Sequence, residues 1–257
     1  MLIEPTPILV PYLLLIFVAI TRAFNAGPLH MLLALPIDKG SKQFNPFQLA
    51  QLEARPVLDI AFHDVYSQSE RALLPHGTIE VDFADTELSD TIGPHVAILA
   101  FMHKRLDVLM GYANVYALAP VARFSALWNN GVPILTTIGL VNSLDDKTEY
   151  KLLTRTMGTY KSLGLSVDTV WTRFNWTQRY AFLFSMYQSE KTGEQEHSEC
   201  YFQMMAIRGQ MTREQDRGRI WDYIKIVEGD NATDFNRVLE EVSYMANGQL
   251  VLICEHV

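Results

Sequence analysis

Two side chains that could bind a ligand, Tyr116 and Arg123, lie seven residues apart in the segment 111–123. This spacing is close to two helical turns, so a helix that begins near Asn114 would carry both side chains on one face. A predicted strand ends at Gly111, and open α/β sheets bind ligands outside the carboxyl ends of their strands. We therefore treat both residues as candidate ligand contacts, with a core tyrosine and a surface salt bridge as the structural alternatives.

Motifs for catalysis are missing from the sequence. It contains no G-x-x-x-x-G-K-[ST] or G-x-G-x-x-G phosphate loop, no G-x-S-x-G nucleophile elbow and no H-E-x-x-H zinc pair. The seven histidines are scattered without the spacing of metal ligands. The formal net charge of -8 comes without a cluster of Lys and Arg, which argues against a surface that follows nucleic-acid phosphates. We expect no catalytic residue, no metal site and no nucleic-acid partner.

The apolar segment 8–20 near the amino terminus is shorter than the roughly 20 residues that a membrane-spanning helix needs. Small residues at Thr21 and Ala23 offer a cleavage site, so residues 1–23 fit a secretory signal peptide. A buried N-terminal helix is the alternative interpretation. No other segment of the sequence is apolar enough to cross a membrane.

Both cysteines, Cys200 and Cys254, would then be in an oxidising compartment, where an even count favours a disulfide. A bridge that closes a loop of this length stabilises a fold by roughly 4 kcal/mol on the chain-entropy model. Two unrelated buried thiols are the alternative. Asn175 and Asn231 each begin an N-x-[ST] triplet, so both are candidate glycosylation sites of a secreted chain.

Short apolar segments alternate with longer helical patterns from His30 to the end, which predicts an α/β fold of βαβ units with parallel sheets. We expect strands at 31–37, 78–83, 108–112, 133–138, 180–187, 221–227 and 250–254. We expect helices at 55–68, 89–104, 115–129, 159–173, 198–213 and 233–246.

The order and lengths of these elements predict two doubly wound parallel-sheet lobes, 30–155 and 156–257, with the crossing near 153–157. The strand expected at 250–254 is apolar throughout, as in the interior of a parallel sheet, which needs helices over both faces. The chain ends three residues later. We therefore expect the second lobe to be incomplete.

Tyr116 and Arg123 belong to a larger set of motifs that runs through most of the chain. Its members are Gly-Tyr-Ala-Asn-Val-Tyr-Ala-Leu-Ala-Pro-Val-Ala-Arg at 111–123, Val-Pro-Ile-Leu-Thr at 132–136, Tyr-Lys-Leu-Leu-Thr-Arg-Thr at 150–156, Tyr-Lys-Ser-Leu-Gly at 160–164, Phe-Asn-Trp at 174–176 and Cys-Tyr-Phe at 200–202. Together they resemble the natriuretic peptide receptors and receptor guanylate cyclases. The ectodomains of that family have the type I periplasmic-binding-protein fold, in which two α/β lobes enclose a cleft.

The resemblance implies a set of peptide-contacting residues in both lobes, namely Asp90, Tyr116, Arg123, Glu149, Tyr187, Tyr201 and Phe202. Aromatic rings supply buried area and charges select the register, so this set suits a peptide ligand. Cys200 and Cys254 match the second disulfide of the family.

Three features depart from the family pattern. The first-lobe disulfide would join the positions of Leu88 and Asn114, and both cysteines are missing together. The family's chloride site borders a Gly-Cys turn, which is Ala113 followed by Asn114 here, and no other cofactor is implied. An acidic and an aromatic contact residue are replaced by Lys225 and Ile226. A small or otherwise different extracellular ligand therefore stays open.

The resemblance implies that the chain is the extracellular ligand-binding region of a plasma-membrane receptor that forms a homodimer. In the full-length parent, ligand binding would be signalled through cyclic GMP. The chain by itself is then a binding module and not an enzyme. A secreted binding protein or decoy, a non-cyclase clearance-type receptor and a neurotransmitter-receptor ectodomain of the same fold are the alternatives.

Overall fold

The structure is a computed structural model that describes residues 27–40, 45, 47–67, 75–128, 131–175, 180–188, 195–196, 199–211, 220–227, 236–237, 240, 243–244 and 252–254. Within 180–188, 195–196, 220–227 and 252–254, and at residues 67 and 211, it describes the backbone alone. The predicted signal peptide at 1–23 and the predicted glycosylation site Asn231 lie outside the described residues.

The first lobe is built on a five-stranded sheet in which every strand pair is parallel. Its order is β2-β1-β3-β4-β5. The strands are β1 (Leu29–Leu35), β2 (Ile79–Asp85), β3 (Val108–Gly111), β4 (Ile134–Thr136) and β5 (Leu153–Arg155). This is the parallel sheet that the alternating pattern predicts.

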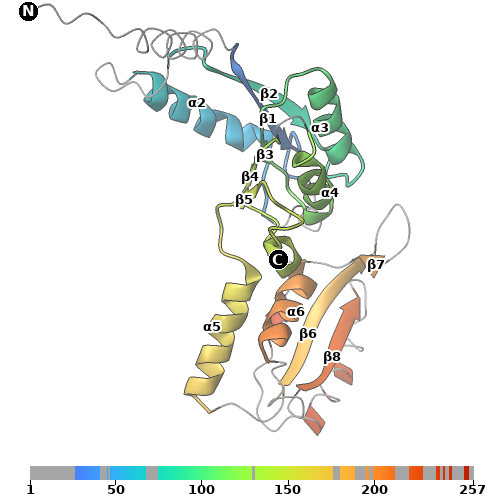
Figure 1. Cartoon of the computed structure of the whole chain (residues 1–257). Coiled ribbons are helices and arrows are strands. Elements are labelled where there is room, and N and C mark those ends of the chain that lie inside the picture. Colours follow the sequence, from blue (N-terminus) through green and yellow to red (C-terminus); the bar gives the residue numbers. More distant parts are fainter. Residues whose placement is uncertain are drawn as a thin grey trace, which may run out of the picture.

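Helices cover both faces of this sheet. Figure 1 shows α2 (Gln51–Ser67) on one side and α3 (Ile92–Met102) and α4 (Val115–Ser125) on the other. The interior strand β1 is consequently buried from Leu32 to Leu35 without alternation, as expected for a parallel strand covered on both faces.

The second lobe has its own sheet and two packed helices. The described strands of this sheet are β6 (Tyr180–Gln188), β7 (Gln195–Glu196), β8 (Ile220–Val227) and β9 (Leu252–Cys254). β6 pairs in parallel with β8 and β9 and antiparallel with β7. Helices α5 (Tyr160–Arg173) and α6 (Glu199–Met211) pack against each other. They approach closely at Gly164, where an added Cβ would lie 2.8 Å from the Ala206 carbonyl oxygen.

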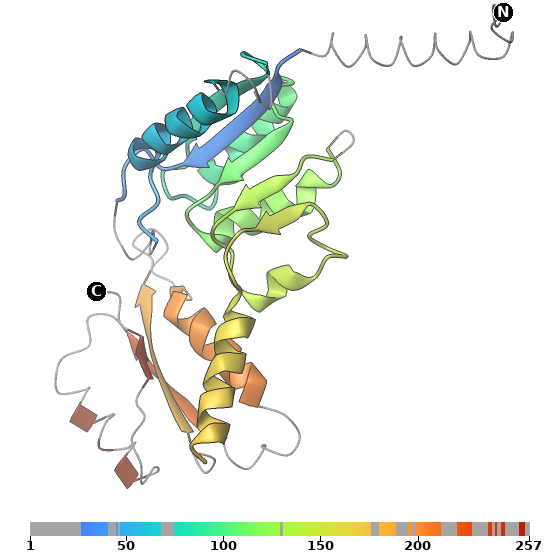
Figure 2. The same cartoon turned by 90° about the vertical axis from the view of Figure 1, so that its left-hand side faces the viewer.

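The two lobes share packed side chains where the chain crosses between them. The buried cluster that fills the first lobe also contains Tyr160 of α5 and Ala206 of α6, and Phe202 packs against it. Figures 1 and 2 both show the first turns of α5 and α6 at the end of the second lobe that faces the first lobe. Contacts with both lobes therefore determine the positions of the residues at the starts of these helices.

Several predicted boundaries differ from the structure. β4 ends at Thr136, before the predicted 138, because the Thr136 hydroxyl accepts from the Ile138 N–H at 3.1 Å and turns the chain. The short strand β7 and the 3-10 helix Asn142–Asp145 were not predicted. Of the helix predicted at 233–246, only residues 236–237, 240 and 243–244 are described, and these are helical. Among the described residues, no helix is both long and apolar enough to span a membrane.

Candidate functional site

The carboxyl end of β3 places the helix that carries Tyr116 and Arg123. Gly111 (φ 114°) and Tyr112 (φ 68°) both have left-handed backbone conformations, which residues with a Cβ rarely adopt. A Cβ at Gly111 would lie only 2.6 Å from the Ala34 carbonyl oxygen, so this position requires glycine. The turn is held by the buried Tyr112 side chain, whose hydroxyl donates to the Gly93 carbonyl oxygen at 3.1 Å.

Helix α4 begins at Val115 because the preceding residue caps it. The Asn114 Oδ1 accepts from the Ala117 N–H at 2.8 Å, which satisfies one of the free donors of the first turn. Asn114 also donates from Nδ2 to the Leu88 carbonyl oxygen at 3.1 Å. One side chain thus joins the start of α4 to the loop before α3, at the two positions where the family pattern implies a disulfide.

Asp90 lies at the end of that loop and is exposed. Its Oδ1 accepts from the Thr91 hydroxyl at 3.2 Å. The neighbouring Ser89 hydroxyl accepts from the Thr91 and Ile92 N–H groups, both at 3.2 Å, and so holds the backbone at the start of α3. Asp90 therefore presents its carboxylate beside a helix start whose backbone is held in place.

Arg123 and Glu149 form an ion pair on the surface. The Arg123 Nε donates to Glu149 Oε1, and their side chains are 52% and 43% exposed. The guanidinium also lies 5.4 Å from the ring centre of Tyr150, which is buried. The hydrogen bond to Glu149 raises the pKa of Arg123, and burial raises the pKa of Tyr150. Both charges remain accessible to a ligand.

Aromatic rings from the two lobes contact each other between α4 and α6. Tyr116 of α4 lies 6.1 Å from Phe202 of α6, measured between ring centres, with the rings tilted by 51°. Phe202 in turn makes an edge contact of 5.6 Å with Tyr201. Tyr116 is 38% exposed. Such ring contacts add stabilisation beyond the buried area. Five of the predicted contacts thus touch one another in two groups: the charged pair Arg123 and Glu149, and the aromatic pair Tyr116 and Phe202 with Tyr201 beside it.

The remaining predicted residues are only partly described. The backbone of Tyr187 pairs with Glu196 of β7, and its side chain lies outside the described residues. Cys200 is buried at the start of α6 and is disulfide-bonded, whereas the side chain of Cys254 lies outside the described residues. Asn175 is exposed just after α5 with a φ of 56°, a conformation that asparagine tolerates well.

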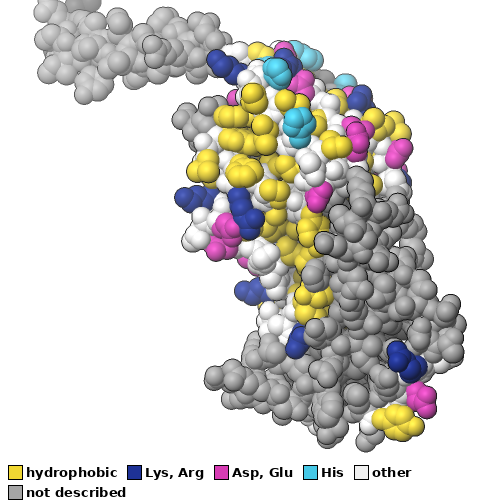
Figure 3. All heavy atoms as spheres, turned by 90° about the vertical axis from the view of Figure 1, so that its right-hand side faces the viewer, with side chains coloured by type: hydrophobic (Ala, Val, Ile, Leu, Met, Phe, Trp, Pro, Cys, Tyr) yellow, Lys and Arg dark blue, Asp and Glu magenta, His cyan; other side chains and the backbone are white. Residues whose placement is uncertain are grey.

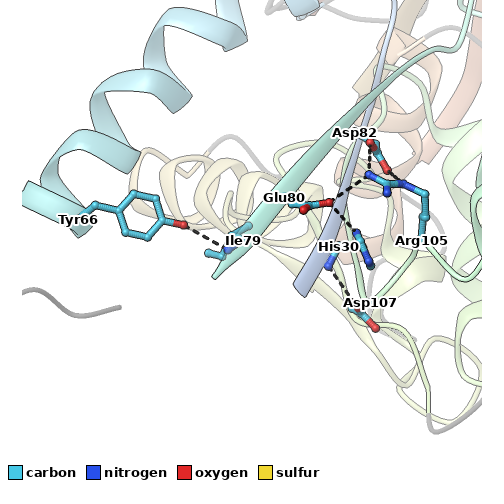
Figure 4. A network of polar contacts seen from close by, with 7 residues as sticks. All are labelled: His30, Tyr66, Ile79, Glu80, Asp82, Arg105 and Asp107. Carbon is cyan, nitrogen blue, oxygen red and sulfur yellow. Dashed lines mark hydrogen bonds and ion pairs between the residues drawn. The ribbon is translucent and has the colours of Figure 1, made fainter. Parts of the chain in front are cut away.

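A second polar cluster lies at the opposite, amino-terminal end of the first three strands (Figure 4). Arg105 donates to Asp82 at 2.7 and 2.9 Å and to Glu80 at 3.3 Å. The His30 Nδ1 lies 3.5 Å from Glu80 Oε2, and the His30 backbone N–H donates to Asp107 Oδ2 at 2.8 Å. The hydrogen bond from Arg105 lowers the pKa of Asp82. These contacts join β1, β2 and the start of β3, and we interpret them as structural.

The roles of three residues in and around the site were not predicted from the sequence. Tyr150 lies under Arg123, Asn114 links α3 to α4, and Tyr160 joins the lobes. Asn114 could have been recognised as a helix cap from its position before α4. The other two depend on contacts between distant segments, for which the local pattern carries no signal. Within the described part of the chain, no group of three or more His, Cys, Asp and Glu residues could hold a metal ion.

Comparisons with known proteins agree with this arrangement. The chain is 29% identical to Receptor-type guanylate cyclase gcy-28 of Caenorhabditis elegans over 269 residues, covering 88% of this chain and 20% of the relative. It is 30% identical to Atrial natriuretic peptide receptor 2 of Rattus norvegicus over 182 residues, covering 68% of this chain and 16% of the relative. With Atrial natriuretic peptide receptor 3 of Rattus norvegicus it shares 29% identity over 193 residues, covering 72% of this chain and 33% of the relative.

The chain therefore spans a third or less of the length of these relatives. Residues 53–255 match the family described as "Receptor family ligand binding region". This match includes the charged pair, the aromatic pair, the described strands of the second lobe and every strand of the first-lobe sheet except β1. With its two α/β lobes, the chain belongs to this family of receptor ligand-binding regions.

Proposed function

We propose that this chain is the extracellular ligand-binding region of a cell-surface receptor and that it binds a peptide through residues of both lobes. The observation that carries this proposal is the ring contact between Tyr116 and Phe202, which brings aromatic surface from both lobes together beside exposed charges. Relatives named as atrial natriuretic peptide receptors and as a receptor-type guanylate cyclase support it.

The charged pair suits a ligand with charges of its own. Arg123 and Glu149 are held together at the surface, where an ion pair contributes less than about 1 kcal/mol. A ligand carboxylate can therefore take the guanidinium, and a ligand amine can take the carboxylate, at little cost to the fold. Aromatic rings nearby supply buried contact area, while Asp90 offers a further negative charge.

We propose that a second copy of the chain binds to the face formed by α3 and α4. The sequence of α3 is apolar apart from His95, yet only Gly93 and Ala97 of this helix are buried. Figure 3 shows hydrophobic side chains gathered on this face of the first lobe. The exposed apolar residues of α3 and of the segment at the end of α4 are Ile98, Leu99, Met102, Phe124 and Leu127. Exposed apolar surface of this kind is typical of an interface.

Other parts of the proposal rest on sequence. We propose lobes at 30–155 and 156–257, a signal peptide at 1–23, and glycosylation at Asn175 and Asn231. The disulfide of Cys200 would join Cys254, the only other cysteine. In a longer parent, ligand binding outside the plasma membrane would be passed to a guanylate cyclase and signalled through cyclic GMP. Chloride binding stays an implication of the resemblance.

A peptide titration tests the binding function. A panel of extracellular peptides that includes atrial natriuretic peptide is titrated into the chain, and cyclic GMP is measured in cells that carry the parent receptor. Saturable binding of one peptide that also raises cyclic GMP would support the proposal. Binding without cyclic GMP would remove the cyclase part, and a folded chain that binds no peptide of the panel would count against a peptide ligand.

A further inference from the structure

Tyr160, the first residue of α5, makes contacts with both lobes. Its backbone N–H donates to the carbonyl oxygen of Leu140 in the first lobe at 2.9 Å. Its ring is 6% exposed and lies in the buried cluster that contains Leu140, Val141 and Ala206. The residue is thus fixed to the first lobe by its main chain and packed between the lobes by its ring.

The hydroxyl of Tyr160 holds the start of α6. It donates to the carboxylate of Glu199, the first residue of that helix. Gln203, one turn further along α6, donates from Nε2 to the same hydroxyl at 3.5 Å. Two residues at the start of α6 are therefore hydrogen-bonded to the same hydroxyl group. Tyr201 and Phe202 lie between them on the helix.

The environment of Glu199 makes this hydrogen bond important. The carboxyl is largely removed from water, and burial raises its pKa. Among the residues that the structure describes, only the Tyr160 side chain opposes this rise, because its hydrogen bond lowers the pKa of Glu199. A buried carboxylate that loses its donor carries the full cost of desolvation, so removing the hydroxyl would favour movement of the helix start toward water.

We propose that Tyr160 is a positioning residue that sets the place of α6 relative to the first lobe and thereby the contact of Phe202 with Tyr116. The path runs from the Leu140 carbonyl through the Tyr160 backbone and hydroxyl to Glu199, and along one turn of α6 to Phe202. The functional meaning of this coupling rests on the proposed function, because it assigns Phe202 to the ligand site. The coupling itself concerns only the fold.

A fluorine probe at position 202 tests the coupling without any ligand. 4-Fluorophenylalanine is incorporated at Phe202 in the full chain, and its ¹⁹F resonance is recorded. The Tyr116→Ala background gives the resonance position of a probe that has lost its partner ring. Tyr160→Phe keeps the ring packing and removes the hydroxyl, so its resonance should move from the wild-type position toward that reference. Glu199→Ala should move it in the same direction.

Two matched controls separate positioning from general loss of stability. Tyr66→Phe removes another tyrosine hydroxyl, which accepts from the Ile79 N–H and lies on α2, across the first-lobe sheet from α4, and should lower the melting temperature without moving the resonance. Glu199→Gln keeps an oxygen acceptor for Tyr160 and should leave the resonance in place. An unchanged resonance in Tyr160→Phe, or an equal change in Tyr66→Phe, would overturn the proposal. Because no ligand is present, a failed peptide titration would leave this result unaffected.

Discussion

The Asn114 side chain donates to the Leu88 carbonyl oxygen at 3.1 Å while it accepts from the Ala117 N–H at 2.8 Å. A single amide group therefore caps α4 and ties the loop before α3 to it. Asp90 follows that loop and Tyr116 lies in the first turn of α4, so Asn114 fixes two proposed ligand contacts relative to each other.

Substitution of Asn114 separates its two contacts. Asn114→Ala loses both and should lower the free energy of unfolding by about 2 kcal/mol, since a cap and a hydrogen bond each contribute about 1 kcal/mol. Asn114→Asp keeps an oxygen acceptor for Ala117 and places a negative charge at the helix start, so it should cost about half as much. Urea unfolding of the two variants measures this order, and equal losses would mean that the cap on the Ala117 N–H contributes nothing.

A disulfide should be able to replace the hydrogen bond between these positions. In Leu88→Cys with Asn114→Cys, the bridge would close a loop between positions 26 apart, which the chain-entropy model values at about 3 to 4 kcal/mol. The oxidised double variant should unfold at higher urea concentration than the reduced one. Mass spectrometry checks the bond, and Leu88→Ser with Asn114→Ser is the matched control without a thiol. Failure to oxidise would show that the two backbones lie too far apart for a bridge.

The sequence predicted the fold class better than it predicted the ends of the strands and helices. Parallel strands buried on both faces leave continuous apolar segments, and β1 shows this directly from Leu32 to Leu35. Boundaries depend on single hydrogen bonds, such as the one from Ile138 to the Thr136 hydroxyl that ends β4. Side-chain capping of this kind has no periodic pattern, so periodicity placed this strand end too late.

In the site, too, residue positions within one helix could be predicted from the sequence, whereas contacts between different elements could not. The helical spacing of Tyr116 and Arg123 placed both on α4. Their partners, Phe202 and Glu149, come from distant segments, and only the family resemblance pointed to them. Tyr150 and Tyr160 were missed because their roles arise from packing between segments, which the spacing of residues along the chain does not encode.

Arg123→Ala should weaken ligand binding much more than it weakens the fold. The ion pair with Glu149 is exposed, so the free energy of unfolding should change by less than about 1 kcal/mol. Affinity for the peptide identified by titration should fall at least about tenfold, as for a buried arginine contact that contributes about 1.4 kcal/mol or more. Arg173→Ala at the end of α5 removes another exposed arginine and should leave affinity unchanged. Unchanged affinity in Arg123→Ala would remove this residue from the site.

A charge placed on the α3–α4 face should prevent dimer formation. Met102 and Leu127 are 70% and 80% exposed there, so Met102→Glu with Leu127→Glu should disturb no core packing. Analytical ultracentrifugation should show a concentration-dependent dimer for the wild type and a monomer for the variant. Leu52→Glu is the control, since Leu52 is 63% exposed but lies on α2, across the sheet. A wild-type chain that sediments as a monomer throughout would contradict the proposed interface.

Glu199→Gln should change how stability depends on pH. Burial raises the pKa of Glu199 above its usual 4.5, so the folded state binds the proton more tightly than the unfolded state does. The favourable contribution of the protonated form is complete below pH 4.5 and is lost as the pH rises through the raised folded value. The substituted glutamine carries no charge and keeps an acceptor for Tyr160. The variant should therefore be more stable than the wild type at neutral pH, and this advantage should disappear in acid.

Asp82→Asn gives a control of opposite sign for that measurement. Its hydrogen bond with Arg105 lowers the pKa of Asp82 below its usual 3.8, so the stabilisation is present above that value and is lost as the pH falls through the lower folded value. Asp82→Asn should thus be less stable than the wild type at neutral pH, with the difference shrinking in acid. Urea unfolding across this pH range compares both variants with the wild type. If Glu199→Gln followed the same course as Asp82→Asn, Glu199 would be stabilised as a carboxylate, and burial could not be its main influence.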